Sequence, residues 1–329
     1  MKKRLIPILI LLPFITAVVC VGIGRYSLGF TESLSVLFAR FTGAEVSKNA
    51  YSVVWNIRLP RIILAAFVGA GLSAAGAAFQ GVFSNPLATP DTLGVASGAS
   101  FGAALAMLIG SPLLGTQVTA LIFGCSACLL TMLIAGRERT SVSSVILGGM
   151  AVSSVFQALV ALVKYVADPV DELPAITYWL MGSMARASYK NLAVGLPLIA
   201  IGTIVIFLLR WRLDVISLSE DEAASLGMNV RLMRTIYIVC ASLITASCVS
   251  MCGQVGWIGL LVPHISRMIG GSSGKSVIPL SVSLGAVFMM IMDTIARTMT
   301  AAEIPISILT ALIGAPMFIA LLRRKGAAE

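Results

Sequence analysis

Long apolar runs separated by short polar intervals dominate the chain. The runs cover residues 5–24, 61–83, 93–109, 116–136, 143–165, 192–209, 235–252, 255–269, 277–296 and 304–322. A helix needs about 20 predominantly apolar residues to cross the hydrocarbon core of a bilayer. The pattern therefore predicts an all-α membrane protein, a polytopic bundle of about ten transmembrane helices that forms one domain over residues 1–329.

Composition agrees with this pattern. Hydrophobic residues make up 58% of the 329 residues and charged residues 11%, with a mean hydropathy of +0.99. A soluble domain carries about 25% charged residues, which excludes that class. The net charge of +9 does not require nucleic acid as a partner, because basic residues of membrane proteins gather on the cytoplasmic side.

The distribution of basic residues predicts the topology. An even number of spans places both termini on one side of the membrane. The first residues, MKKR, and the basic run RRK at residues 323–325 place that side in the cytoplasm. The polar interval around residues 211–234 then lies on the cytoplasmic side as well.

This polar interval has the signals of a short helical hairpin. Ser219 and Glu222 have the spacing of a capping box, in which two side chains satisfy free backbone N–H groups. Gly227 is a candidate left-handed C-cap, and Asn229 could begin a second short helix. We expect an ordered cytoplasmic hairpin at about residues 211–234; a solvated connector is the alternative.

Two arginines stand where the second span begins, on the outer face. Arg58 and Arg61 flank Leu-Pro in the sequence RLPR. A basic residue there opposes both the positive-inside tendency and the positive end of the helix dipole. The position favours a negatively charged partner, although guanidinium groups that reach lipid phosphates would also explain it.

Charged residues also occur in the ninth span. Asp293 and Arg297 are four residues apart and share one helix face, so they can pair. The pair is either a proton or ion relay or a neutralised surface arginine. His264 is the only histidine, and one histidine cannot build a multi-ligand metal site. A structural hydrogen bond is the simpler interpretation of this residue.

Small and polar residues are concentrated between the second and third spans. The segment from Gly69 to Gly98 is rich in Gly, Ala and Ser, which let helices approach closely in lipid. Gln80, Asn85 and Ser97 are polar groups near membrane depth. They face either a water-filled path or a neighbouring helix to which they donate hydrogen bonds.

Nucleotide binding by this chain is not expected. Gly274, Lys275 and Ser276 match the end of a phosphate-binding loop, but Ile269 stands where its first glycine belongs. The chain also lacks a clustered set of acidic, basic or metal-ligating residues, so an enzyme is not expected either.

Six ordered motifs carry a resemblance to a known family. They are RLPR at 58–61, the run from Gly69 through NPLATPDTLG to Gly98, WLMGS at 179–183, SLGMNV at 225–230, GWIGLLVPHISR at 256–267 and EIPISILTALIGAPMFI at 303–319. Together they resemble a FecCD-type permease, the membrane subunit of bacterial ATP-binding cassette (ABC) importers for ferric siderophores, haem and cobalamin. The resemblance covers nearly the whole chain.

The resemblance implies a multi-pass permease of the bacterial cytoplasmic (inner) membrane that has no catalytic residues, metal or cofactor of its own. Its expected partners are a second permease subunit in a homodimer or heterodimer, two cytoplasmic subunits that bind ATP and Mg, an external or periplasmic substrate-binding protein, and membrane lipid. Nucleic acid is not among them.

The resemblance also implies roles for individual residues. The residues expected to couple the permease to the ATPase are those of the hairpin: Ser219, Glu222, Ala223, Ala224, Leu226, Gly227, Asn229 and Val230. Docking of the binding protein falls on Arg58, Arg61 and Arg297. The cytoplasmic gate would include Thr140, Ser141, Ser143 and Ser144. The candidates for the translocation path do not come from the resemblance; they are polar residues in the apolar segments, namely Gln80, Asn85, Ser97 and Gln157.

The substrate is not specified by these motifs. An iron chelate, in particular a ferric siderophore, is the leading expectation, and haem and cobalamin remain open. The alternative outside this family is an ion-coupled secondary transporter in which Asp293 carries protons.

Overall fold

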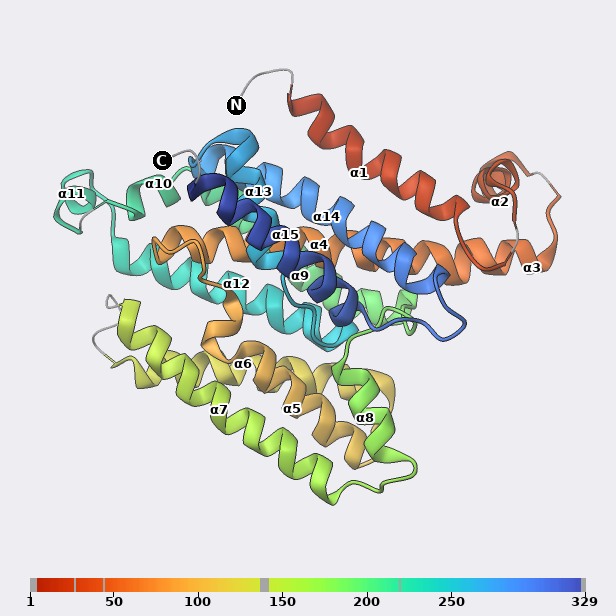
Figure 1. Cartoon of the computed structure of the whole chain (residues 1–329), viewed down its shortest axis with the longest axis horizontal. Helices are drawn as coiled ribbons and strands as arrows, with labels where there is room; N and C mark the ends of the chain where they lie inside the picture. The colour runs from red at the N-terminus through yellow and green to blue at the C-terminus, as the bar shows by residue number, and fades with distance from the viewer. Residues whose placement is uncertain (1–4, 27, 44, 137–141, 219, 327–329) are drawn as a thin grey trace.

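The apolar runs of the sequence form helices that lie side by side along a common direction (Figure 1). The computed structural model describes residues 5–26, 28–43, 45–136, 142–218 and 220–326. Within these ranges, six helices are long and apolar enough to cross a membrane, and four shorter apolar helices occupy the remaining predicted spans. The apolar helices are α1 (Leu5–Gly22), α4 (Leu59–Val82), α5 (Val95–Leu108), α6 (Leu113–Ile134), α7 (Val142–Val166), α9 (Tyr189–Leu209), α12 (Val230–Cys252), α13 (Ile258–Gly270), α14 (Gly274–Thr298) and α15 (Ile306–Gly326).

Shorter elements lie at the two ends of the bundle. At one end are α2 (Phe30–Thr42) and α3 (Lys48–Tyr51), and at the other are α10 (Leu213–Ile216) and α11 (Glu220–Ser225) (Figure 1). The connections also contain η1 (Ser52–Arg58), η2 (Pro90–Leu93) and α8 (Glu172–Leu180). The helix α2 was not predicted, because its apolar face is too short to read as a span.

Tyr178 and Trp179 lie in the short helix α8, which connects α7 to the segment before α9. Trp179 is buried, whereas Tyr178 is exposed and its hydroxyl donates to the carbonyl of Glu303 at 3.1 Å. In the turn before α8, the carboxylate of Asp168 accepts backbone N–H groups from Asp171 and Val170. These two hydrogen bonds hold the pKa of Asp168 below its usual range.

Helix α4 is the centre of the bundle. It packs against α9, α12, α13 and α14, and most of its residues are buried. Glycines permit this close packing: a methyl group added at Gly69 would overlap the carbonyl of Gly285 on α14, and one at Gly76 would overlap the carbonyl of Gly259 on α13. The expected close approach of small residues is confirmed at these two crossings.

The second span begins earlier than the sequence predicted. A continuous helix runs from Lys48 to Val82, through the π-helical stretch η1, so Pro60 does not mark a helix start. The π-helical geometry explains why proline is tolerated there. The N–H of Leu59 bonds to the carbonyl of Val54, five residues back instead of four. This shifted hydrogen-bond pattern accommodates Pro60, the next residue, which has no N–H to donate.

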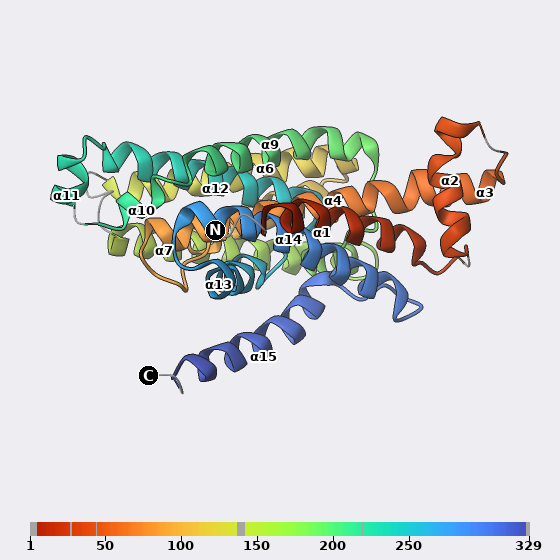
Figure 2. The same ribbon diagram turned by 90° about the horizontal axis from the view of Figure 1, so that it is seen from above.

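Helix α15 departs from the bundle. Figure 2 shows it leaning away from the other spans, and Leu312 and Ile319 on it are exposed. An apolar helix exposed in this way needs lipid or another apolar surface around it.

Candidate translocation cavity, hairpin and buried charge cluster

A polar cavity of about 310 Å³ lies among α5, α7, α12 and the segment that precedes α13. Its polar lining comes from distant parts of the sequence and includes Thr89, Asp91, Ser97, Ser153, Gln157, Thr245 and Gln254. Polar groups at membrane depth normally face protein or water rather than lipid. The cavity satisfies that requirement with hydroxyl and amide groups and one carboxylate.

Hydrogen bonds hold the cavity wall in place. The hydroxyls of Ser97 on α5 and Ser153 on α7 are 2.8 Å apart, and the amide of Gln157 donates to Ser153 at 3.1 Å. Gln254, in the segment before α13, donates to the hydroxyl of Ser100 on α5 at 2.8 Å. Each hydroxyl and amide still has spare hydrogen-bonding capacity, so the wall can also bind water or a polar solute.

Trp257 lines the same cavity in an unusual backbone conformation. It precedes α13 with φ at 69°, a left-handed value that costs a non-glycine residue about 1–3 kcal/mol. Its ring lies 6.4 Å from that of Phe318, and a methyl group added at Gly314 would overlap it. Contacts with α15 therefore hold this indole at the cavity wall.

The four predicted path residues separate into two pairs. Ser97 and Gln157 line the cavity. Gln80 instead donates to the carbonyl of Gly259 at 3.2 Å and accepts from Arg267. It therefore joins two helices by hydrogen bonds, the second of the two interpretations given for it above. The amide oxygen of Asn85 accepts from the N–H of Leu87 at 2.9 Å and stabilises the turn after α4.

Several cavity residues were not predicted. Ser153 could have been found, because it lies four residues before Gln157 and so shares its helix face. Gln254 and Trp257 lie between helices, and no periodic pattern marks such positions. Asp91 follows a proline in a short 3-10 turn and gave no signal beyond its charge.

The polar interval at 211–234 contains α10 and α11. Helix α11 ends as predicted at Gly227, which has φ at 75°, and the N–H of Met228 bonds back to the carbonyl of Ala223 at 3.1 Å. The predicted capping residue Ser219 lies outside the described residues. Asn229 does cap a helix, since its side chain accepts from the N–H of Leu232 at 2.9 Å.

The predicted second short helix of the hairpin is wrong. The helix that Asn229 begins is α12, which continues from Val230 to Cys252. The interval lacks a helix breaker after Asn229, and the apolar run that follows extends the same helix into the bundle. The first turn of the span and the end of the hairpin are therefore one rigid element.

The hairpin is anchored to the bundle and exposed beyond it. The carboxylate of Asp214 accepts from the hydroxyl of Ser273 at 2.7 Å and from the N–H of Gly274 at 2.6 Å, which ties α10 to the start of α14. Ala223 and Val230 are buried. The remaining described coupling candidates are exposed: Glu222, Ala224, Leu226, Gly227 and Asn229.

The predicted gate lies largely outside the described part of the chain. Thr140 and Ser141 fall in the gap at 137–141, whereas Ser143 and Ser144 lie in the first turn of α7. The gating role of this segment stays a prediction.

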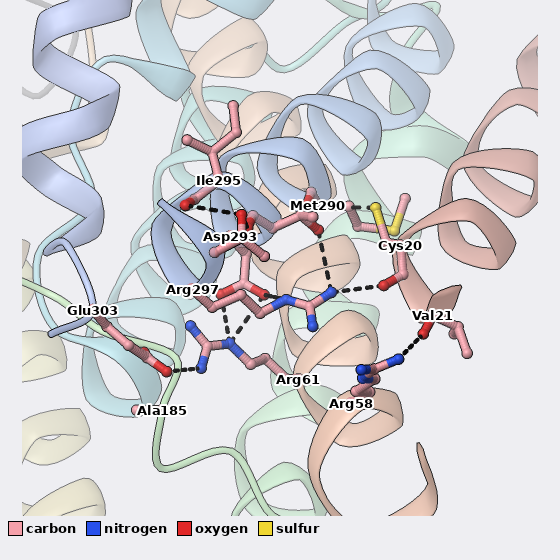
Figure 3. Close-up of polar contacts among 12 residues, drawn as sticks. Cys20, Val21, Arg58, Arg61, Ala185, Met290, Asp293, Ile295, Arg297 and Glu303 are labelled. Atoms are coloured by element: carbon pink, nitrogen blue, oxygen red, sulfur yellow. Dashed lines mark hydrogen bonds and ion pairs between the residues drawn. The ribbon is translucent and has the colours of Figure 1, made fainter. Parts of the chain in front are cut away.

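A buried charge cluster joins α4, α14 and the segment before α15 (Figure 3). The Nε atom of Arg61 donates to both carboxylate oxygens of Asp293, at 2.7 and 3.0 Å. Its Nη1 donates to Glu303 at 2.7 Å. Asp293 is 1% exposed and Arg61 5%, so this pairing is what makes their burial tolerable.

Two further arginines bind backbone carbonyls beside this cluster. Arg297 donates to the carbonyl of Cys20 at 2.6 Å, and its Nε is 3.7 Å from Asp293. Arg58 donates to the carbonyls of Val21 and Tyr26, both at 2.8 Å. The predicted pairing of Asp293 with Arg297 is present, but the contact of Asp293 with Arg61 is shorter.

These contacts bear on the predicted docking residues. Arg58, Arg61 and Arg297 are each less than 10% exposed and are committed to partners within the chain. Their docking role stays a prediction, and in this conformation it would require them to exchange those partners. Asp293, the candidate proton carrier, is likewise paired and does not line the cavity.

Metal binding finds no support in the described residues, where no three His, Cys, Asp or Glu side chains are placed to hold an ion. The ring of His264 lies 5.7 Å from that of Phe318, in an edge-on contact between α13 and α15.

Comparison with known proteins connects this architecture to transport. The FecCD transport family matches residues 9–324. The molybdate import system permease protein MolB of Haemophilus influenzae is 40% identical over 311 residues, covering 94% of this chain and 92% of the relative. A probable iron chelatin transport system permease protein of Helicobacter pylori is 36% identical over 316 residues, covering 94% and 95%.

A solved structure agrees over the full length. An inward-facing conformation of a putative metal-chelate type ABC transporter is 38% identical, with a TM-score of 0.89, and covers 98% of this chain and 100% of that chain. The ion-coupled alternative is therefore not retained. An ABC permease works with an ATPase and a binding protein and does not itself hydrolyse ATP. The chain belongs to the FecCD transport family and is a multi-pass membrane permease of a bacterial ABC importer.

Proposed function

We propose that the chain forms half of the membrane path of an importer for a ferric chelate, with the cavity around Ser97, Ser153 and Gln157 as its share of that path. The cavity carries this proposal, because it gathers polar side chains from α5 and α7 around an open volume at membrane depth. Its hydroxyl and amide groups hydrogen-bond weakly to many solutes, which suits passage without tight binding.

A second permease subunit completes the path in this proposal. Helix α7 lines the cavity and α15 packs against its Trp257, and both helices expose apolar side chains, including Leu147, Val155 and Leu312. A two-fold pairing would bring two such cavities together. The partner is a second copy of this chain or a related permease.

The hairpin transmits ATP hydrolysis in this proposal. Of two ATP-binding subunits that hold ATP and Mg, one docks on each permease subunit, at the exposed side of α11 and the turn after it, with Leu226 as the apolar anchor. The hairpin end and both termini then lie in the cytoplasm. Because Asn229 joins the hairpin directly to α12, a displacement of α11 is passed to a helix that lines the cavity.

In this proposal the external binding protein docks at the end of the bundle opposite the hairpin. Docking through Arg58, Arg61 and Arg297 would require carboxylates of the binding protein to replace Asp293, Glu303 or backbone carbonyls as their partners. Arg186 lies in the connection before α9, and Lys190 lies in the first turn of that helix. Both are exposed, so they need no exchange of partners to meet such carboxylates.

Molybdate is a second candidate substrate. It is favoured by the relative that transports it, which is 40% identical to this chain, compared with 36% for the iron chelatin relative. Both substrates carry a metal within a shell of oxygen-rich polar groups that a hydroxyl-lined path can pass, and selection between them falls to the binding protein.

Transport by the reconstituted importer tests the proposal. The permease would be placed in liposomes with the ATPase and the binding protein from the same genome neighbourhood. We expect ATP-dependent uptake of a radiolabelled ferric siderophore. Uptake of molybdate alone would replace the first substrate with the second, and uptake of only haem or cobalamin would overturn both.

A variant in the cavity tests the path. Ser153→Leu places an apolar side chain at the polar wall and should reduce uptake at least about tenfold, while ATPase association is unchanged. Ser126→Leu is the matched control, because Ser126 lies outside the cavity on α6 and its hydroxyl bonds within its own helix at 2.8 Å. Equal transport by both variants would contradict the assignment of the cavity.

A further inference from the structure

A second, larger hollow lies on a different side of the bundle. It has a volume of about 900 Å³ and runs between α1, α4, α9 and α14. Its walls are apolar side chains such as Phe14, Phe67, Ile204 and Val282. The polar cavity described above shares no lining residue with it.

The groove has the length of one bilayer leaflet. Its lining residues extend along α9 from Ile199 to Phe207 and along α14 from Lys275 to Ala286. At 1.5 Å per residue these stretches span about 12 and 16 Å. Half of a hydrocarbon core of about 30 Å is about 15 Å.

One end of the groove is basic. Arg210 and Lys275 are its only charged lining residues, and they meet where α9 and α14 reach the hairpin end. Both cations lie near the indole of Trp211, with Nζ of Lys275 at 4.2 Å and the guanidinium of Arg210 at 5.6 Å from the ring centre. Tryptophan and basic residues at this depth are typical of the headgroup region.

These two cations are not neutralised within the described part of the chain. Neither forms an ion pair with a carboxylate there. Arg210 donates through Nη1 to the carbonyl of Phe207, and its Nε is buried without a hydrogen-bond partner. The nearby carboxylate of Asp214 is occupied by Ser273 and Gly274. The groove therefore ends in positive charge that can accept an anion.

We propose that this groove binds an anionic phospholipid, with its phosphate at Arg210 and Lys275 and an acyl chain between α1, α9 and α14. Basic sites between transmembrane helices bind anionic headgroups in this way. A second permease subunit is a poor occupant, because α9 lies on the opposite side of the bundle from α15 (Figure 2). A bound lipid would brace α14 close to Asp214, the residue that anchors the hairpin.

Binding of defined lipids to the purified permease tests this proposal. The protein in detergent is incubated with phosphatidylglycerol or phosphatidylcholine, and the bound lipids are counted by native mass spectrometry. We expect phosphatidylglycerol to bind more tightly. The double variant Arg210→Gln with Lys275→Gln should weaken its binding roughly 30-fold, since each basic residue near an anionic lipid contributes about fivefold.

A matched control separates a site from general attraction by charge. Arg212→Gln with Arg231→Gln removes the same charge at the same end from two exposed residues outside the groove. Its phosphatidylglycerol affinity should stay within about twofold. An equal loss in both double variants, or no loss in the first, would overturn the proposal.

Two single variants cover the case in which the double variant does not fold. Lys275 is exposed, so Lys275→Gln should keep the fold and weaken binding about fivefold. Ala200→Phe narrows the apolar part of the groove and should lower binding of both lipids. Unchanged binding in either variant would contradict occupancy of the groove.

Discussion

The two ends of the bundle handle charge in opposite ways. At one end, Arg61 pairs with both Asp293 and Glu303 in a largely buried cluster. At the hairpin end, Leu226 and the residues around it are exposed in the turn after α11, and the hairpin is tied to the bundle through Asp214 on α10. The first arrangement stabilises the chain by itself, and the second leaves a surface for another protein. Polar residues in a membrane protein therefore do not all indicate contact sites.

Breaking the buried cluster should have the largest effect. Arg61→Ala leaves Asp293 without its shortest partner in a buried site, and we expect a loss of about 3–5 kcal/mol of stability. Thermal unfolding of the purified protein measures it. Arg186→Ala, in an exposed position, should change stability by less than about 0.5 kcal/mol.

A paired replacement distinguishes charge burial from packing. Arg61→Met with Asp293→Leu removes both charges and should recover most of the loss. If Arg61→Ala were no more destabilising than the exposed control, the cluster would not hold the helices together.

The hairpin should show the reverse behaviour, with normal folding and lost association. Leu226→Arg should leave thermal stability within about 0.5 kcal/mol but weaken ATPase binding about 30-fold, the size expected for an interface anchor. Affinity measurements with the purified ATPase test this. Met299→Arg is the matched control, because Met299 is 66% exposed and Leu226 65%. Equal ATPase affinity in both variants would contradict the coupling role of α11.

The junction between hairpin and bundle should show the smallest effect. Asn229→Ala removes the cap of α12 and should cost about 1 kcal/mol, whereas Asn229→Asp keeps an acceptor and should be nearly neutral. Thermal unfolding again gives the values. Similar losses in the two variants would show that the cap hydrogen bond is not what Asn229 contributes.

The candidate site was predictable where one helix contains the whole signal. Gly227 and Asn229 were found because helix ends have local sequence requirements. The pairing of Asp293 with Arg297 follows from their spacing of four residues. Ser97 and Gln157 were found only as polar residues at membrane depth, and their meeting across α5 and α7 could not be read from either helix alone.

The outer arginines show why the position of a residue in the sequence does not predict whether its side chain is exposed. Arg58 and Arg61 were expected at the outer surface because a span was expected to begin there. The π-helical stretch η1 extends that helix instead, and α1, α2 and α14 cover both side chains. Which carbonyl or carboxylate reaches a guanidinium depends on neighbouring helices that are far away in the sequence.

By itself the sequence determined the membrane class, the positions of the apolar helices and the family, because hydrophobic length and ordered motifs are properties of the chain alone. Tertiary structure decided which polar groups are buried together, which line the cavity and which stay exposed on the hairpin. The physical reason is that the free energy of a polar group in a bilayer depends on its partner, and the partner is chosen by helix packing.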